Sequence, residues 1–264
     1  MSSVKKLWPL LTATHRYDKS ISTRGRGAGE MIDAPILAYL IETANGRILY
    51  DVGCDYSKIA DAERSARYYD PENFHFGPPC MTEEQRVPSW LGRLGLRPAD
   101  IDVVFISHLH FDHAGGLNEL RQCGCGADVH VQKDELDAAL SGEDAACFQD
   151  EFVDQPALRV VEGEYDLGAG VRAISTPGHT AGHMSMWLEM PKGPPVLLAG
   201  DAADLTENIA DEVPPGACWH NRFDEATDSI RKLKRMAREE GAQLWPNHDF
   251  AFYRGLQTFP EWHE

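Results

Sequence analysis

The sequence predicts a layered α/β fold, in which buried strands alternate with helices that cover the sheet. Three observations support this fold class. The chain has 264 residues, of which 42% are hydrophobic and 25% are charged, a composition typical of globular proteins. Short apolar runs of strand length alternate with segments that carry the 3.6-residue period of a helix. No window reaches 18 consecutive apolar residues, so we expect no transmembrane helix.

The first predicted element is a β-hairpin over residues 36–53. Apolar residues alternate with their neighbours from 37 to 41, and Asn45-Gly46 predicts a type I′ turn before the return strand. Residues 55–88, which are rich in aromatic side chains, predict a long irregular surface insertion. Proline and glycine are scattered along the chain and form no linker, so we expect a single domain over residues 1–264.

Strands and helices alternate in the rest of the chain. The clearest element is a helix over 224–240, where Ala226, Ile230, Leu233 and Ala237 share one face and a glycine follows the last turn. The other predicted elements are a helix at 90–94, strands at 101–106 and 127–132, a helix at 134–140, and strands at 171–175, 184–188, 195–199 and 243–246.

Charge and cysteine usage limit the partners that the chain can have. Its 25 basic and 42 acidic residues give a net charge of −17, which argues against nucleic acid and against anionic membrane surfaces. The six cysteines form no CxxC pair, and the first residues lack the apolar stretch of a secretory leader. We therefore expect reduced thiols and a cytoplasmic location.

The segment Ser107–Gly116, which reads SHLHFDHAGG, carries the strongest chemical signal and follows the apolar run 101–106. His108 and His110 are two residues apart in extended chain, so their rings point the same way. Asp112 and His113 follow where the chain turns. Imidazole nitrogens and carboxylate oxygens suit zinc and related divalent metals, and packing this cluster without a metal would bury unpaired polar groups.

Three further candidate ligands, His179, Asp201 and His248, come at the ends of later predicted strands. They complete one triplet of His108, His110 and His179, a second triplet of Asp112, His113 and His248, and a bridging carboxylate at Asp201. His183 is interpreted as a supporting group, and Cys54 as a structural residue. The remaining histidines have no partners by spacing and are interpreted as non-ligands: His15, His75, His130, His220 and His263.

Four motifs in this order, SHLHFDHAGG, TPGHTAGH, GDAAD and NHD, resemble the metallo-β-lactamase superfamily. The resemblance covers roughly residues 30–264. It implies a four-layer αββα sandwich, with Asp51 as the carboxylate that orients a metal-bound histidine. It does not identify the substrate, because one fold can host many reactions.

A finer resemblance comes from the second half of the chain. Five segments are similar to those of quorum-quenching N-acyl-homoserine lactone lactonases. They are Glu207-Asn208, the segment 211–216 (DEVPPG), the helix around 229–234, His248-Asp249 and the ending 258–262 (TFPEW). That family commonly has a tyrosine three residues after the bridging aspartate. This chain has Asp204 there, for which we hypothesise a role in ordering a water or a substrate amide.

The resemblance implies a dinuclear hydrolase, with two divalent ions that are expected to be Zn²⁺, iron and manganese being the alternatives. A metal-bridging hydroxide would attack the carbonyl of a lactone, with N-acyl-homoserine lactone as the expected substrate. Asp112 is the candidate that carries the proton to the leaving group, and Asp201 holds the metal pair. The alternatives are a hydrolase of another lactone, cyclic ester or thioester, and an iron-dependent oxidoreductase on the same fold.

The expected partner is a small neutral lactone or ester, and a homodimer is a further possibility. The acyl tail would lie on aromatic residues of the loops, although the same residues could serve for packing or as a dimer contact. The candidates are Tyr68, Tyr69, Phe74, Phe76 and Phe148.

Overall fold

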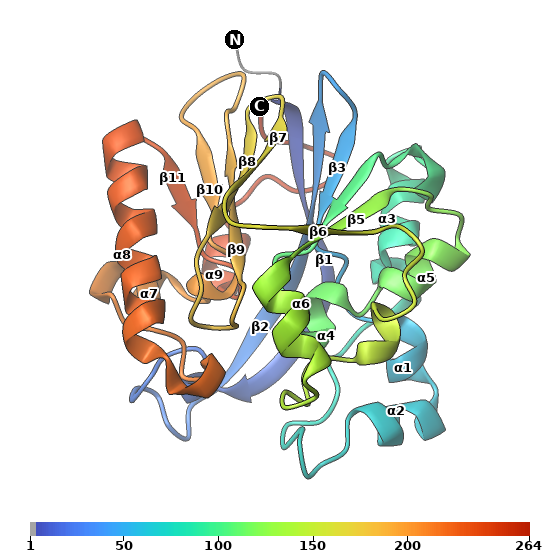
Figure 1. Cartoon of the computed structure of the whole chain (residues 1–264), viewed down its shortest axis with the longest axis vertical. Coiled ribbons are helices and arrows are strands. Elements are labelled where there is room, and N and C mark those ends of the chain that lie inside the picture. Colours follow the sequence, from blue (N-terminus) through green and yellow to red (C-terminus); the bar gives the residue numbers. More distant parts are fainter. Residues whose placement is uncertain (1–3) are drawn as a thin grey trace.

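The computed structural model describes residues 4–264, in which two β-sheets pack face to face (Figure 1). The larger sheet has the strand order β1-β2-β3-β4-β5-β6. The first three of its strands are antiparallel, and the pairs from β3 to β6 are parallel. Its strands are β1 (Val4–Asp18), β2 (Met31–Thr43), β3 (Arg47–Tyr50), β4 (Val103–Phe105), β5 (Asp128–Gln132) and β6 (Leu158–Val161).

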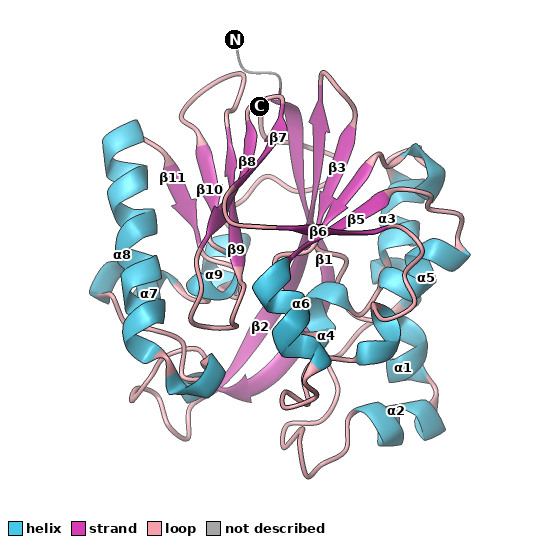
Figure 2. Cartoon of the chain, viewed as in Figure 1, coloured by secondary structure: helices cyan, strands magenta, loops and turns pink. Residues whose placement is uncertain are grey.

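The smaller sheet has the order β11-β10-β9-β8-β7, and only its β10–β11 pair is parallel. Its strands are β7 (Tyr165–Gly168), β8 (Val171–Ser175), β9 (Met184–Leu188), β10 (Val196–Leu198) and β11 (Gln243–Trp245). Helices lie on the outer sides of both sheets (Figure 2). The α-helices of residues 4–264 are α1 (Tyr56–Ala60), α2 (Ala62–Tyr68), α3 (Val87–Arg93), α4 (Phe111–Ala114), α5 (Leu117–Gln122), α6 (Lys133–Leu140), α7 (Thr206–Asp211), α8 (Phe223–Glu240) and α9 (Phe250–Tyr253).

Three apolar layers hold the sandwich together. Alternate side chains of β2 enter two of them, because successive residues of a strand point to opposite faces. Tyr39 packs between the sheets, whereas Leu40 packs under the helices of the larger sheet. Leu233 of α8 joins Trp187 in the third layer, on the outer face of the smaller sheet. Helix, sheet, sheet and helix thus form the four layers of the predicted αββα fold, which is confirmed.

The predicted hairpin is present, but its turn is not type I′. That turn needs positive φ at both central residues, and only Gly46 (φ 140°) has it. The segment 55–88 is only partly irregular, because Asp55 and Asp61 cap the short helices α1 and α2. No helix within residues 4–264 is long and apolar enough to span a membrane.

Candidate metal centre and its pocket

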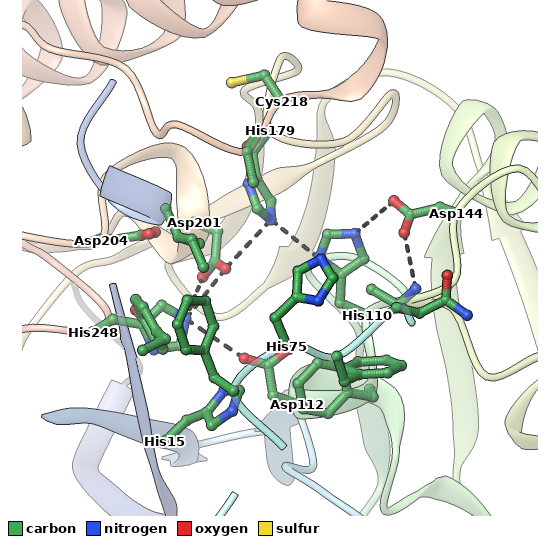
Figure 3. A pocket seen from close by; sticks show the side chains of 18 of the residues that line it. His15, His75, His110, Asp112, Asp144, His179, Asp201, Asp204, Cys218 and His248 are labelled. Atoms are coloured by element: carbon green, nitrogen blue, oxygen red, sulfur yellow. Dashed lines mark hydrogen bonds and ion pairs between the residues drawn. The ribbon is translucent and has the colours of Figure 1, made fainter. Parts of the chain in front are cut away.

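The candidate ligands come from loops that follow strands of both sheets. His108 to His113 lie after β4, and α4 begins within this segment. The loops after β8, β10 and β11 carry His179, Asp201 and His248. Figure 3 shows side chains from these separate loops pointing to a common centre. The loop of His179 packs closely on α8, because a Cβ atom at Gly178 (φ +131°) would collide with the Ala226 backbone.

The first predicted triplet is brought together by these loops. His108 Nε2 lies 3.1 Å from His110 Nδ1, which lies 3.2 Å from His179 Nε2. The ligand atoms of this triplet all lie within 4.8 Å of one another. Asp112, His113 and His248 form a second group that meets the same limit. In it, Asp112 Oδ2 is 3.7 Å from Nε2 of each histidine.

Asp201 lies between the two triplets and contacts both. Its Oδ2 is 3.7 Å from His108 Nε2 and 3.4 Å from His179 Nε2. Its Oδ1 is 3.3 Å from His113 Nε2, and His248 Nε2 lies 3.2 Å from each of the two oxygens. A carboxylate with this arrangement can hold two cations side by side. The candidate ligand set therefore has the layout of a dinuclear centre.

In each candidate histidine, one ring nitrogen points away from the centre, and this outer nitrogen contacts an oxygen. Carbonyl and carboxylate oxygens only accept, so these contacts leave the other ring nitrogen without a hydrogen. His108 donates to Ser107 Oγ because that hydroxyl donates to Asp51. The contacts are His108–Ser107 (3.0 Å), His110–Asp144 (3.1 Å), His113–Asp51 (2.8 Å), His179–Ala217 O (2.9 Å) and His248–Pro35 O (2.8 Å).

These contacts turn nitrogen lone pairs toward one another at the centre. Two lone pairs at about 3 Å repel unless a cation lies between them. The buried Nε2 atom of His113 has no hydrogen-bond partner, which is the state expected of a metal ligand. The residues present therefore fit divalent metal ions.

The carboxylates around the candidate centre also favour a cation. Burial lowers the pKa of His248, but the charge of Asp201 outweighs burial and raises this pKa to about 10. Burial is likewise outweighed at His110, where Asp144 raises the pKa to about 9. At His179 burial dominates and lowers the pKa to about 4. The carboxylates thus favour positive charge at His248 and His110, whereas burial favours the neutral, metal-binding form of His179.

Asp51 and His183 support the candidate ligands through hydrogen bonds. Asp51, 1% exposed, accepts hydrogen bonds from Ser107 N (2.7 Å) and Ser107 Oγ (2.8 Å) as well as from His113. His183 Nε2 accepts from the Asp201 backbone amide (2.9 Å), and its Nδ1 contacts Thr176 Oγ1. His183 thus fixes the backbone that carries the bridging carboxylate.

We expect Asp51→Asn to weaken metal binding by about 10- to 100-fold, the usual effect of losing such a support. If the amide NH₂ group of asparagine faces the donor His113 Nδ1–H, the Nδ1–H tautomer of the ring is no longer stabilised. A chelator-competition titration measures the affinity. Asp228→Asn, at an exposed position on α8, is the matched control. Equal affinities for the two variants would contradict the role of Asp51.

A pocket of about 510 Å³ opens over the candidate centre. Of the predicted substrate residues, Phe74, Phe76 and Asp204 line it. Phe74 packs edge-on against Phe111, which forms part of the same wall (5.4 Å between centroids). Several other residues that line the pocket are not predicted from the sequence: Tyr17, Phe111, Asp144, Cys218 and Trp219.

Three predicted acyl contacts, Tyr68, Tyr69 and Phe148, are not among the residues that line this pocket. Tyr69 and Phe148 are buried in the cluster behind Phe74 and Phe111. The Tyr68 hydroxyl donates to Asp150 Oδ2 (2.9 Å). These side chains support the aromatic wall, which is the packing role that the sequence left open.

Other histidines lie in this pocket as well. His15, His75 and His220 line it, yet none of them belongs to a group of possible metal ligands among residues 4–264. His15 Nε2 lies 3.0 Å from Gly77 O, which ties β1 to the loop after Phe76. His110, Asp144 and Cys147 form an additional potential ligand group. In it, the Asp144 contact occupies the outer nitrogen of His110.

Comparisons with known proteins agree with this geometry. The family model for the metallo-beta-lactamase superfamily matches residues 32–244. An N-acyl homoserine lactonase from a Bacillus species is 34% identical over 263 residues, which cover 98% of this chain and 99% of that protein. The N-acyl homoserine lactonase AiiA of Bacillus thuringiensis subsp. kurstaki is 32% identical over 263 residues, with coverage of 98% and 99%.

Solved structures extend the match to three dimensions. An N-acyl homoserine lactone hydrolase with the product N-hexanoyl-L-homoserine at its catalytic metal centre superposes with a TM-score of 0.87 at 32% identity, covering 98% of this chain and 99% of that one. For a quorum-quenching N-acyl homoserine lactone lactonase, the TM-score is 0.84 at 32% identity, with coverage of 99% and 100%. The chain therefore belongs to the metallo-beta-lactamase superfamily, as one of its metal-dependent hydrolases.

Proposed function

We propose that this protein is a metal-dependent lactonase that opens the ring of N-acyl-homoserine lactones. The observation that carries the proposal is the pair of ligand triplets joined by Asp201 beneath a pocket with an aromatic wall. Relatives named as N-acyl homoserine lactonases match this chain over almost its whole length. One solved relative holds an acyl-homoserine product at its catalytic metal centre.

The first ion would be held by His108, His110 and His179, and the second by Asp112, His113 and His248. Asp201 would hold both, as its carboxylate contacts histidines of both triplets. Bound divalent ions supply a water that is acidic enough to attack at neutral pH, and a positive charge that polarises the carbonyl. We propose Zn²⁺ for both positions, because histidine and carboxylate ligands suit it.

Asp112 is the residue that we propose as the proton carrier. Its side chain is 14% exposed, compared with 6% for Asp201, and both residues line the pocket. One carboxylate oxygen would bind an ion, while the other would accept the proton of the attacking water and deliver it to the alkoxide leaving group. Burial lowers the pKa of His15, which also lines the pocket.

The pocket suits a neutral substrate with an apolar tail. Phe74, Phe76 and Phe111 line it and offer apolar surface to an acyl chain. Carboxylates and histidines line it as well, among them those of the candidate metal centre. A carboxylate product would leave a protein of net charge −17 without electrostatic retention. The homodimer and the single-domain organisation stay predictions.

A proton-release assay on a panel of esters tests the proposal, because opening a lactone at neutral pH liberates one proton. The panel holds N-acyl-homoserine lactones of two chain lengths, a γ-alkyl lactone without an amide, and an acyclic thioester. We expect the acyl-homoserine lactones to have the highest kcat/KM values. Turnover of the thioester alone would contradict the lactonase proposal.

A further inference from the structure

A buried hydroxyl pair lies beside the candidate metal centre and is not used by the chemistry described so far. Tyr17 and His15 are two residues apart on β1, so both side chains point to the same face of the strand, toward the pocket. Tyr17 is only 6% exposed, and its hydroxyl lies 2.9 Å from Ser22 Oγ. Among the described residues that line the pocket, Tyr17 is the one with a hydroxyl side chain.

Ser22 holds the Tyr17 hydroxyl from a fixed position. Ser22 is fully buried, and its carbonyl accepts from Asn208 Nδ2 (2.8 Å). Its backbone amide donates to Lys19 O (3.0 Å). Tyr17 and Ser22 thus form a buried hydroxyl pair at the pocket wall.

Tyr17 shares its pocket with the candidate metal ligands. Asp112, Asp201 and His248 line the pocket together with Tyr17. Burial, followed by the charge of Asp204, raises the pKa of Tyr17 well above the usual value. Tyr17 therefore stays a neutral phenol with a proton to donate.

We propose that the Tyr17 hydroxyl donates a hydrogen bond to the carbonyl oxygen of the bound lactone, and that Ser22 positions this hydroxyl. The Ser22 hydroxyl can donate to the Tyr17 oxygen, which leaves the phenolic proton free to face the pocket. As the carbonyl carbon is attacked, negative charge grows on its oxygen and this hydrogen bond strengthens. The inference rests on the proposed lactonase function.

Asp204 lines the same pocket. It is 3% exposed, and its Oδ1 atom is buried without a hydrogen-bond partner. Burial, followed by the charge of Asp201, raises the pKa of Asp204 to about 8. The role that the sequence suggests for Asp204, ordering a water or a substrate amide, stays a proposal.

Tyr17→Phe in the metal-loaded enzyme tests the proposal on two substrates: an N-acyl-homoserine lactone and a γ-alkyl lactone that lacks the amide. We expect kcat to fall by about 100-fold on both, with KM changing far less, because one donor to the developing oxyanion is lost. Metal content and melting temperature should match those of the unmodified enzyme. Tyr165→Phe, on strand β7, is the matched control.

Ser22→Ala tests the positioning role. It should lower kcat by a smaller factor, and adding it to Tyr17→Phe should cost nothing more, because both changes remove the same contact. Unchanged kcat in Tyr17→Phe, or a loss confined to the KM of the amide substrate, would overturn the inference. If the unmodified enzyme opened neither lactone, the proposed function would fail and the inference with it.

Discussion

Asp201→Ala is expected to lose bound metal and lactone hydrolysis together. Both oxygens of Asp201 lie within 3.2–3.7 Å of histidine nitrogens from the two triplets, so no other candidate ligand serves both positions equally. Removing it takes one ligand from each ion and ends the fixed spacing between them. Because the metal pair is expected to supply several kcal/mol of transition-state stabilisation, kcat/KM should fall by at least about 1,000-fold.

Metal content per chain and kcat/KM, measured on the same preparations, check this expectation. Asp228→Asn is a suitable control, since it alters a carboxylate on the exposed face of α8. A folded Asp201→Ala variant with two ions and near-normal turnover would show that Asp201 is not the bridge.

Asp112→Asn should separate the two metal positions. It removes a ligand only from the second triplet, so we expect one tightly held ion per chain instead of two. The variant also loses the proposed proton carrier, whose contribution is typically 100- to 10,000-fold, so kcat should fall by about that range.

Substrates with different leaving groups distinguish these two effects of Asp112→Asn. An aryl ester releases a phenoxide that needs little help from a proton, whereas a lactone releases a basic alkoxide. With excess metal added to refill the second position, the loss of kcat should be much smaller on the aryl ester. Equal losses on both substrates would remove Asp112 from proton transfer and leave it as a ligand.

The metal centre was largely predictable because its signal is local. His108, His110, Asp112 and His113 lie within six residues, a density that has few explanations other than a metal. The later candidates were found because each follows an apolar strand. The family resemblance then supplied the arrangement of the layers, which no short pattern contains.

Tyr17 and the pocket wall were not predictable in the same way. Side chains of β1 enter the apolar layers on both sides of its sheet, and the strand contains a proline, so it gives no clean alternation from which a strand could be assigned. Aromatic residues such as Tyr69 and Phe74 look alike in sequence, although only Phe74 lines the pocket. What separates them is tertiary packing, because Tyr69 lies behind Phe111 in the cluster.

Two metal ions, held by these triplets, are proposed to open a lactone ring. A titration of metal-free protein with Zn²⁺, with proton release from an N-acyl-homoserine lactone as the readout, tests this proposal most directly. We expect activity to rise from near zero and to reach its plateau at two equivalents per chain. Full activity in the metal-free protein, or no ring opening at any metal content, would contradict it.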